Sequence, residues 1–181
     1  YAHMGKKGVI AAILEYPDHP EGNPSVSIPG AAIPSGSAVT AIIGAGNFTS
    51  STILPALKKA GTPIRYIASA KGLSAKILAK KAGAAMATSD YQQVLEDPEV
   101  RLVMITTRHD LHGRMVTEAL KAGKHVFVEK PLCLTAEELD TIIDTYREAT
   151  VKQPVLLTVG FNRRFAPLAI RMKELAGEGP L

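Results

Sequence analysis

The chain of 181 residues is long enough for one full hydrophobic core, and its 46% apolar and 21% charged residues are ordinary globular values. Its net charge of +4 comes without Lys/Arg clusters interleaved with stacking rings, so we expect no nucleic-acid partner. No apolar run approaches the roughly 20 residues of a membrane span, so no membrane partner is expected. A single cysteine excludes an internal disulfide and fits a reducing, cytoplasmic compartment.

The first 37 residues differ in composition from the rest of the chain. Residues 1–4 (YAHM) are typical of a tag remnant, and an apolar stretch from Val9 to Tyr16 is compatible with a strand. The segment that follows is rich in Pro, Gly and Ser, and its prolines exclude a continuous helix. We therefore predict that residues 1–37 comprise a tag remnant, the tail of a preceding domain and an extended linker.

From residue 38 onward, apolar runs alternate with amphipathic stretches, which is typical of a parallel sheet covered by helices. Right-handed crossovers then predict a doubly wound α/β sheet, a Rossmann fold, in the order 3-2-1-4-5-6. The predicted domain spans residues 38–161, and residues 162–181 begin a connection to a second domain. We predict strands near 39–43, 63–68, 84–87, 101–105, 124–128 and 154–159, and helices near 50–60, 74–82, 90–96, 110–122 and 135–149.

Several helix ends carry recognisable local chemistry. Ser74 and Asp110 are predicted to cap helices that stop at Gly83 and Gly123, and Thr135 is predicted to open a capping box. The helix after that box is predicted to bury one apolar face: Leu139, Ile142, Ile143 and Tyr146.

The stretch AVTAIIGAGNFTSST, residues 38–52, joins a strand to a helix through two glycines. Gly44 permits a tight turn, and Gly46 lets backbone N–H groups approach a pyrophosphate, to which the helix N-terminus adds partial positive charge. Thr49 stands where the usual third glycine would be, so we expect the helix to lie slightly further from the strand. This turn indicates a dinucleotide site, although a glycine turn by itself is often only structural.

The second predicted strand ends at Ser69, and Lys71 follows two residues later. An NAD-selective site usually has Asp or Glu at this position to accept hydrogen bonds from the ribose hydroxyls. Neither residue follows the second predicted strand of this chain. A hydroxyl with a nearby ammonium group favours the 2′-phosphate of NADP. The alternative is that Lys71 points to water, so the predicted cofactor is NAD(P) with a preference for NADP.

The fourth predicted strand ends in hydroxyl, guanidinium and imidazole side chains. Thr106, Thr107, Arg108, His109 and His112 meet at a helix start beside the crevice. A lone histidine is more often structural, but two histidines at i and i+3 are harder to dismiss. Their spacing is too little to indicate a metal site, and we predict that the chain binds no metal.

The fifth predicted strand, HVFVEKP, runs directly into Glu129, Lys130 and Pro131. The proline disfavours the helical region for Lys130 and holds it extended at the strand tip, which directs an ammonium group into the crevice. A lysine there can orient a substrate hydroxyl and help to move its proton. The alternative is that Glu129 only forms a surface ion pair.

The sixth predicted strand ends in GFNRRFAP, where Arg163 and Arg164 follow at once. Guanidinium groups at this place are suited to an anionic or polyhydroxylated substrate, although either residue is equally suited to an interface.

Taken together, these segments resemble the Gfo/Idh/MocA family of NAD(P)-dependent oxidoreductases. The matching pieces are GAGNF with LPALKKAG, TTRHDLH, EALKAGKHVFVEKPL and VGFNRRFAP, which cover about residues 38–170 in the expected order. The resemblance implies a Rossmann domain followed by an α/β domain that forms the substrate site and, commonly, the oligomer interface. It also implies hydride transfer to or from a carbon of a sugar- or cyclitol-like small molecule.

Carried over residue by residue, the resemblance makes Lys130 the catalytic lysine, while Arg163 and Arg164 are predicted as substrate residues from their place after the sixth strand. The family usually has Pro and Asn in place of Arg108 and His109, which leaves the local contacts of that loop open. The cofactor-binding residues implied are Gly44, Gly46, Asn47, Phe48, Ser69, Thr106, Thr107, His109, His112, Glu129 and Lys130. Lys71 is added to the predicted cofactor site on the 2′-phosphate argument above.

The family's remaining catalytic groups, a histidine and often an aspartate, lie beyond the point that corresponds to Leu181. We therefore expect residues 1–181 to bind dinucleotide without completing a turnover. The stretch GVIAAILEYP near the N-terminal end is similar to the closing strand of a medium-chain zinc alcohol dehydrogenase domain, which suggests a fused parent protein.

Two other functions fit parts of the pattern. A dinucleotide-sensing or scaffold module would bind the cofactor without chemistry and would not require Lys130. A methyltransferase on a similar sheet would leave that lysine without a role.

Overall fold

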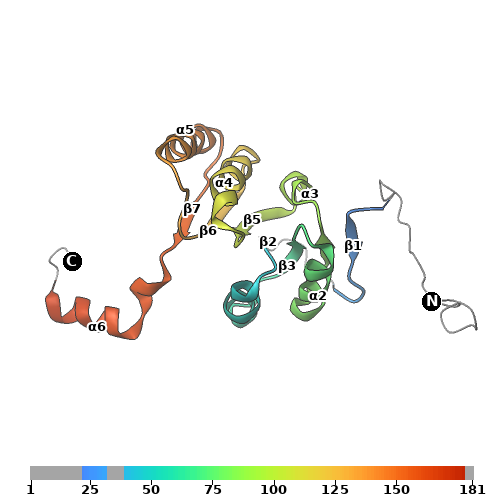
Figure 1. Ribbon diagram of the computed structural model, residues 1–181, viewed down its shortest axis with the longest axis horizontal. Coiled ribbons are helices and arrows are strands. Elements are labelled where there is room, and N and C mark those ends of the chain that lie inside the picture. Colours follow the sequence, from blue (N-terminus) through green and yellow to red (C-terminus); the bar gives the residue numbers. More distant parts are fainter. Residues whose placement is uncertain (1–21, 32–38, 178–181) are drawn as a thin grey trace, which may run out of the picture.

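The computed structural model describes residues 22–31 and 39–177, and a mixed sheet runs through its centre (Figure 1). Six strands are parallel and alternate with helices, as the sequence predicts. The sheet order is β1-β4-β3-β2-β5-β6-β7, so the predicted order 3-2-1-4-5-6 is confirmed for β2 to β7. These strands are β2 (Val39–Ile43), β3 (Ile64–Ala68), β4 (Met86–Thr88), β5 (Val100–Ile105), β6 (His125–Glu129) and β7 (Leu157–Gly160).

One strand was not predicted. Within the segment expected to be linker, β1 (Ser25–Ser27) pairs antiparallel with β4 and forms the edge of the sheet. Its register joins Val26 to Ala87, and the backbone N–H of Ser89 donates to Pro24 O at 2.9 Å. The prediction of an extended linker is therefore wrong for these three residues. The strand predicted at Val9 to Tyr16 lies outside the described residues.

Helices cover both faces of the sheet (Figure 1). The first begins as a π-helical turn, η1 (Thr49–Ile53), which continues directly into α1 with Pro55 in its first turn, where a missing N–H is tolerated. A short 3₁₀ turn, η2 (His109–Leu111), leads into α4 in the same way. The α-helices are α1 (Leu54–Lys59), α2 (Gly72–Ala82), α3 (Gln92–Glu96), α4 (His112–Lys121), α5 (Ala136–Lys152) and α6 (Pro167–Ala176).

The apolar side chains of β2 alternate between two core layers. Ile42 packs in the layer under α1 and α2 with Leu54 and Leu78. Ile43 packs in the opposite layer, under α3, α4 and α5, with Val116. Because every residue of β2 is buried, this strand is the centre of the core and holds the turn at its carboxyl end in a fixed place.

The predicted helix caps were only partly correct. The Thr135 hydroxyl accepts a hydrogen bond from the Glu138 backbone N–H at 3.2 Å, which confirms the cap of α5. Ser74 lies inside α2, which begins at Gly72, and Asp110 lies in the 3₁₀ turn before α4, so neither side chain caps its helix. Both helices do end in left-handed glycines as predicted, at Gly83 and Gly123.

The buried face of α5 is rotated from the predicted one. Ile142 is buried, whereas Leu139 and Ile143 are 39% and 37% exposed. Thr145 and Ala149 are the other buried positions of this helix, at i+3 and i+7 from Ile142. The helix therefore meets its neighbours along a narrower stripe than its apolar pattern indicates.

The C-terminal part of the described chain leaves the sheet. After β7, the 3₁₀ turn η3 (Asn162–Phe165) leads into α6, which projects away from the other helices and has no buried residue (Figure 1). Among the described residues, no helix is both long enough and apolar enough to cross a membrane.

A charged network ties β3 to the turn before β5. The Arg65 Nε and the Tyr66 hydroxyl donate to Asp97 Oδ2 at 2.6 and 3.0 Å. The buried Lys124 Nζ donates to the carbonyl oxygens of Asp97 and Val100 at 2.7 and 2.9 Å. Burial lowers the pKa of Lys124, and the Asp97 charge opposes this effect. Burial and the Asp97 carboxylate together raise the pKa of Tyr66.

We expect Asp97→Ala to lower the free energy of unfolding by about 2–4 kcal/mol, because it leaves the Arg65 guanidinium and the Tyr66 hydroxyl without their acceptor. Chemical denaturation measures this effect. The matched control is Asp144→Ala, since the Asp144–Arg147 pair is exposed and such pairs contribute about 0–1 kcal/mol. Equal losses in the two variants would contradict a special role for the Asp97 network.

Candidate dinucleotide site

The carboxyl ends of four parallel strands lie side by side at one edge of the sheet. Strand register places Ile43 beside Ile105, Ile105 beside Val128, and Val128 beside Val159. The residues that follow these four positions therefore stand in one row. A cleft of about 390 Å³ opens there, lined by Phe48, Thr106, Thr107, His109, Glu129, Lys130, Asn162 and Arg163.

The glycine turn approaches the neighbouring strand end too closely for a side chain. Gly44 has a φ of +121°, and a Cβ on it would lie 2.6 Å from Thr106 Oγ1 and 2.7 Å from the Thr106 backbone. By contrast, a Cβ on Gly46 would meet no heavy atom within 4 Å. The turn is thus packed against Thr106 at Gly44, whereas no protein atom lies within contact of a Cβ at Gly46. An open backbone before a helix N-terminus is the arrangement that a pyrophosphate requires.

Two threonines hold this turn from beneath. The buried Thr49 donates its hydroxyl hydrogen to Gly44 O at 2.9 Å, and its Oγ1 lies 2.8 Å from Thr106 Oγ1. Thr106 Oγ1 also lies 3.1 Å from Gly44 O. The residue at the position of the missing third glycine therefore bonds the start of the helix to the turn. The glycine turn and the end of β5 are joined into one unit by these contacts.

On the other side of the cleft, β6 and β7 place a carboxylate and two cations. Glu129 pairs with Gly160 in the sheet, and a Cβ on Gly160 would lie 2.6 Å from Glu129 Oε1, so only glycine leaves room for this carboxylate. Lys130 follows Glu129 directly, and Arg163 reaches the same cleft from η3. Among the described residues, neither Lys130 nor Arg163 belongs to an ion pair. Both charges therefore remain available to a ligand.

The structure places the two histidines of the TTRHDLH stretch differently. His109 is exposed and lines the cleft, whereas His112 is fully buried behind it. The His112 ring nitrogens face backbone carbonyls, Nδ1 at 2.7 Å from Pro131 O and Nε2 at 3.2 Å from Thr107 O. With no exposed surface, His112 cannot touch a cofactor in this structure, and its predicted role as a contact residue is corrected.

Some predicted residues lie beside the cleft without lining it. Gly46 and Asn47 are exposed on the turn, and the half-buried Ser69 and exposed Lys71 follow β3, the strand next to β2. These places are at the same edge of the sheet but outside the cleft itself. Arg164 is exposed and its guanidinium lies 6.0 Å from the centre of the Phe165 ring, and neither residue lines the cleft.

Asn162 is the cleft residue that the sequence analysis missed. It directly precedes the two arginines that were singled out by their charge. Considering every polar residue after the sixth strand, rather than only the charged ones, would have found it.

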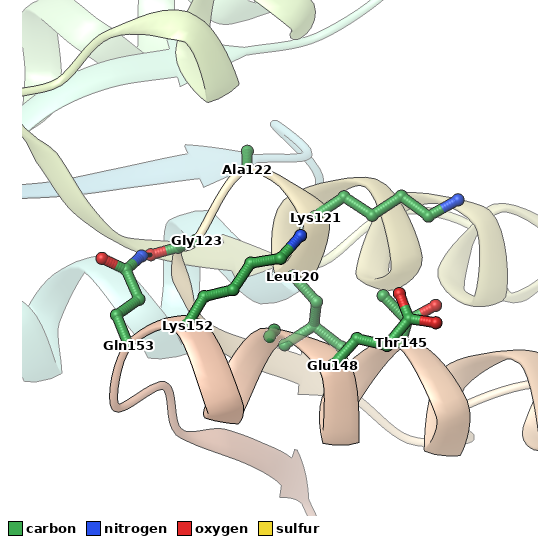
Figure 2. A pocket seen from close by; sticks show the side chains of 9 residues that line it. Leu120, Lys121, Ala122, Gly123, Thr145, Glu148, Lys152 and Gln153 are labelled. Carbon is green, nitrogen blue, oxygen red and sulfur yellow. Dashed lines mark hydrogen bonds between the residues drawn. The ribbon is translucent and has the colours of Figure 1, made fainter.

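A second hollow lies at the opposite edge of the sheet, where α4 ends and β6 begins. It measures about 260 Å³ and lies between the last turns of α4 and α5. Figure 2 shows the Gln153 side chain beside Gly123, whose carbonyl oxygen accepts a hydrogen bond from Nε2 at 2.7 Å, and the nearby Lys121 and Lys152 side chains. None of the predicted site residues lies there. In the part of the chain that the structure describes, no three His, Cys, Asp or Glu side chains gather as a metal site requires.

Residues 39–160 match the family described as oxidoreductases with an NAD-binding Rossmann fold, GFO_IDH_MocA. The chain belongs to the Gfo/Idh/MocA oxidoreductase family. The family match covers β2 through β7, which is the part of the chain that builds the cleft except for Asn162 and Arg163.

Two relatives of similar sequence are named as dehydrogenases. A scyllo-inositol 2-dehydrogenase (NAD(+)) of Bacillus subtilis is 39% identical over 107 residues, which are 59% of this chain and 30% of that protein. A scyllo-inositol 2-dehydrogenase (NADP(+)), IolW, of the same organism is 37% identical over 92 residues, 51% of this chain and 25% of that protein. Their names give different cofactors, so the family does not resolve the cofactor preference.

The fold is shared with solved structures of a probable dehydrogenase and of an NAD-binding oxidoreductase. The crystal structure of a probable dehydrogenase from Thermotoga maritima superposes with a TM-score of 0.67 at 30% identity, covering 76% of this chain and 40% of that chain. This chain spans less than half the length of these relatives.

Proposed function

We propose that this chain is the dinucleotide-binding domain of an NAD(P)-dependent oxidoreductase that transfers hydride to or from a carbon of a sugar- or cyclitol-like substrate. The observation that carries the proposal is that Phe48 of the glycine turn and Lys130 of the β6 tip line one cleft. A pyrophosphate-binding turn and a lysine positioned for proton transfer must open onto the same space for such a reaction to occur.

The residues of the turn fit the cofactor. The open backbone at Gly46, Asn47 and Phe48 would hold the pyrophosphate, and Thr106, Thr107, His109 and Glu129 would line the nicotinamide side. Ser69 and Lys71, after the neighbouring strand, would contact the adenosine ribose. When bound, a nicotinamide dinucleotide supplies the hydride acceptor or donor.

Lys130 would act on the substrate hydroxyl. In the oxidation direction, a carbonyl C=O would form as the carbon gives up a hydride to the oxidised dinucleotide and the hydroxyl proton passes to Nζ of Lys130, which accepts it as the neutral amine. The reverse reaction returns the proton from Nζ to the new alkoxide oxygen. Because no ion pair engages Lys130 within residues 22–31 and 39–177, its amine is available for this contact.

The substrate would be oriented from the β7 side. Arg163 and Asn162 line the cleft and offer hydrogen-bond donors to a polyhydroxylated ligand, and Arg164 lies next to them in η3. The inositol dehydrogenases named above act on such ligands. We also propose that the complete protein forms a homo-oligomer through the second domain that the family resemblance implies.

We expect the chain to bind NADPH more tightly than NADH, because Lys71 offers an ammonium group and no carboxylate follows β3. Lys71→Ala is expected to reduce NADPH affinity by a few fold, the usual effect of losing one exposed ion pair, and to leave NADH affinity unchanged. Fluorescence titration of both cofactors measures this. Lys76→Ala, an exposed lysine further along α2, is the matched control. A clear NADH preference would contradict the predicted selectivity, and no binding of either cofactor would contradict the proposed function.

A further inference from the structure

The buried His112 connects the two loops that carry most of the cleft residues. Its Nδ1 lies 2.7 Å from Pro131 O, next to Lys130, and its Nε2 lies 3.2 Å from Thr107 O. The His109 ring packs edge-on against it, with ring centres 5.6 Å apart. One fully buried side chain thus touches the loop after β5 twice and the loop after β6 once.

These contacts restrain the loops because the partners are backbone atoms. A carbonyl oxygen only accepts, so a His112 ring nitrogen must supply the proton in a hydrogen bond, and the shorter contact assigns it to Nδ1–H toward Pro131 O. Buried hydrogen bonds are favoured by the low local dielectric and fix the groups that they join. Since Pro131 directly follows Lys130, holding the Pro131 carbonyl holds the lysine backbone at the strand tip.

We propose that His112 is a positioning residue for the nicotinamide end of the cleft, an inference that rests on the proposed function. It acts through the Nδ1–H hydrogen bond to Pro131 O, which holds the Lys130–Pro131 backbone, and through the His109 ring that packs edge-on against it; it does not touch a ligand. The glycine turn is held independently of it, by Thr49 and Thr106. Loss of His112 should therefore loosen one end of the cleft and leave the pyrophosphate turn intact.

Calorimetric titration of the 181-residue chain with two ligands separates positioning from folding. NADH occupies the whole dinucleotide site, and ADP-ribose lacks the nicotinamide ring. His112→Leu is expected to weaken NADH binding about tenfold, the effect of losing roughly one hydrogen bond's free energy, and to change ADP-ribose binding by less than about twofold. His112→Gln keeps an N–H donor of similar reach and is expected to restore most of the NADH affinity.

The matched control is His125→Leu. That ring lies at the start of β6, at the other edge of the sheet, where its Nδ1 accepts a hydrogen bond from Leu156 N–H at 3.1 Å. Its loss should affect the two ligands equally or not at all. If His112→Leu does not fold, the comparison of wild type with His112→Gln and His112→Asn takes its place, with Asn too short to reach Pro131 O.

The outcomes distinguish the inference from the proposed function. Equal losses of NADH and ADP-ribose affinity in the His112 variants would show a purely structural role and overturn the inference. Unchanged NADH affinity would overturn it as well. If the wild-type chain bound neither ligand, the proposed function itself would fail. A selective loss of NADH affinity with rescue by glutamine is the expected result.

Discussion

Replacing Lys130 with alanine is expected to lower kcat of the complete protein in the proposed hydride-transfer reaction by about 100-fold or more, the usual contribution of a positioned proton-transfer group. Dinucleotide affinity should change by less than about threefold, because the turn of Gly44 to Phe48 carries the pyrophosphate site and does not contact Lys130 through any hydrogen bond in the described residues. Steady-state kinetics on an inositol substrate, together with cofactor titration of the same variant, measure the two effects separately.

Two further variants provide a control and separate substrate orientation from proton transfer. Lys121→Ala removes an exposed lysine at the opposite edge of the sheet, beside the hollow in Figure 2, and should leave kcat unchanged. Lys130→Arg keeps the positive charge, but its guanidinium does not give up a proton. If Lys130 only orients the substrate, the arginine variant retains part of kcat, whereas a proton-transfer role predicts a loss close to that of alanine.

The Lys130 variant also decides between an enzyme and a dinucleotide sensor. A sensor or scaffold module requires the glycine turn but no amine at the tip of β6. A parent protein whose function survives Lys130→Ala unchanged would therefore favour the sensor and contradict the catalytic role of this residue.

The strand order was predictable because each strand carries its own signal. Runs such as Ala41–Ile43 and Leu102–Ile105 are continuously apolar, which is typical of strands buried on both faces, and the helices between such strands leave only right-handed crossovers. Strand boundaries shifted by up to three residues, as at β7, which begins at Leu157 rather than 154. The ends of a strand depend on where it pairs with the neighbouring strands, and the local sequence carries no information about that pairing.

β1 could not be predicted for a related reason. Ser25–Ser27 is short and polar and lies among prolines, and it becomes a strand only because the edge of β4 offers unpaired backbone groups. The helix starts at Gly72 and His112 were missed because nearby cap residues, Ser74 and Asp110, suggested other positions. For β1, the tertiary pairing outweighed the local preference.

The candidate site was predictable to the extent that it follows from topology. Phe48, Thr106 and Lys130 meet because parallel strands end at one edge, which the alternation of elements already implies. The burial of His112 was not predictable, since the two carbonyls that enclose its ring belong to residues 5 positions before and 19 positions after it. A histidine beside a cleft has the same sequence signal whether it faces the ligand or supports the loops.

The turn after β2 requires glycine at position 44. Gly44→Ala is expected to lower the free energy of unfolding by about 3 kcal/mol or more, because a positive φ strains an L-residue by about 1–3 kcal/mol and overpacking adds about 1–3 kcal/mol. The added methyl would meet Thr106 side-chain and backbone atoms at 2.6–2.7 Å, and the backbone there cannot move without breaking the β2–β5 pairing. Denaturant unfolding measures the stability loss, and dinucleotide binding should disappear with it.

Gly46→Ala is the matched variant two residues away, and its expected result is the reverse. A Cβ on Gly46 meets no atom within 4 Å, and its φ is not positive, so the chain should fold with a stability within about 1 kcal/mol of wild type. The methyl group would instead stand on the open side of the turn and keep a pyrophosphate from the backbone N–H groups, which should weaken dinucleotide binding by about tenfold or more. Wild-type affinity in Gly46→Ala would show that the pyrophosphate does not bind at this turn, even if Gly44→Ala unfolds as expected. The pair therefore separates the glycine that the fold requires from the glycine that the ligand requires.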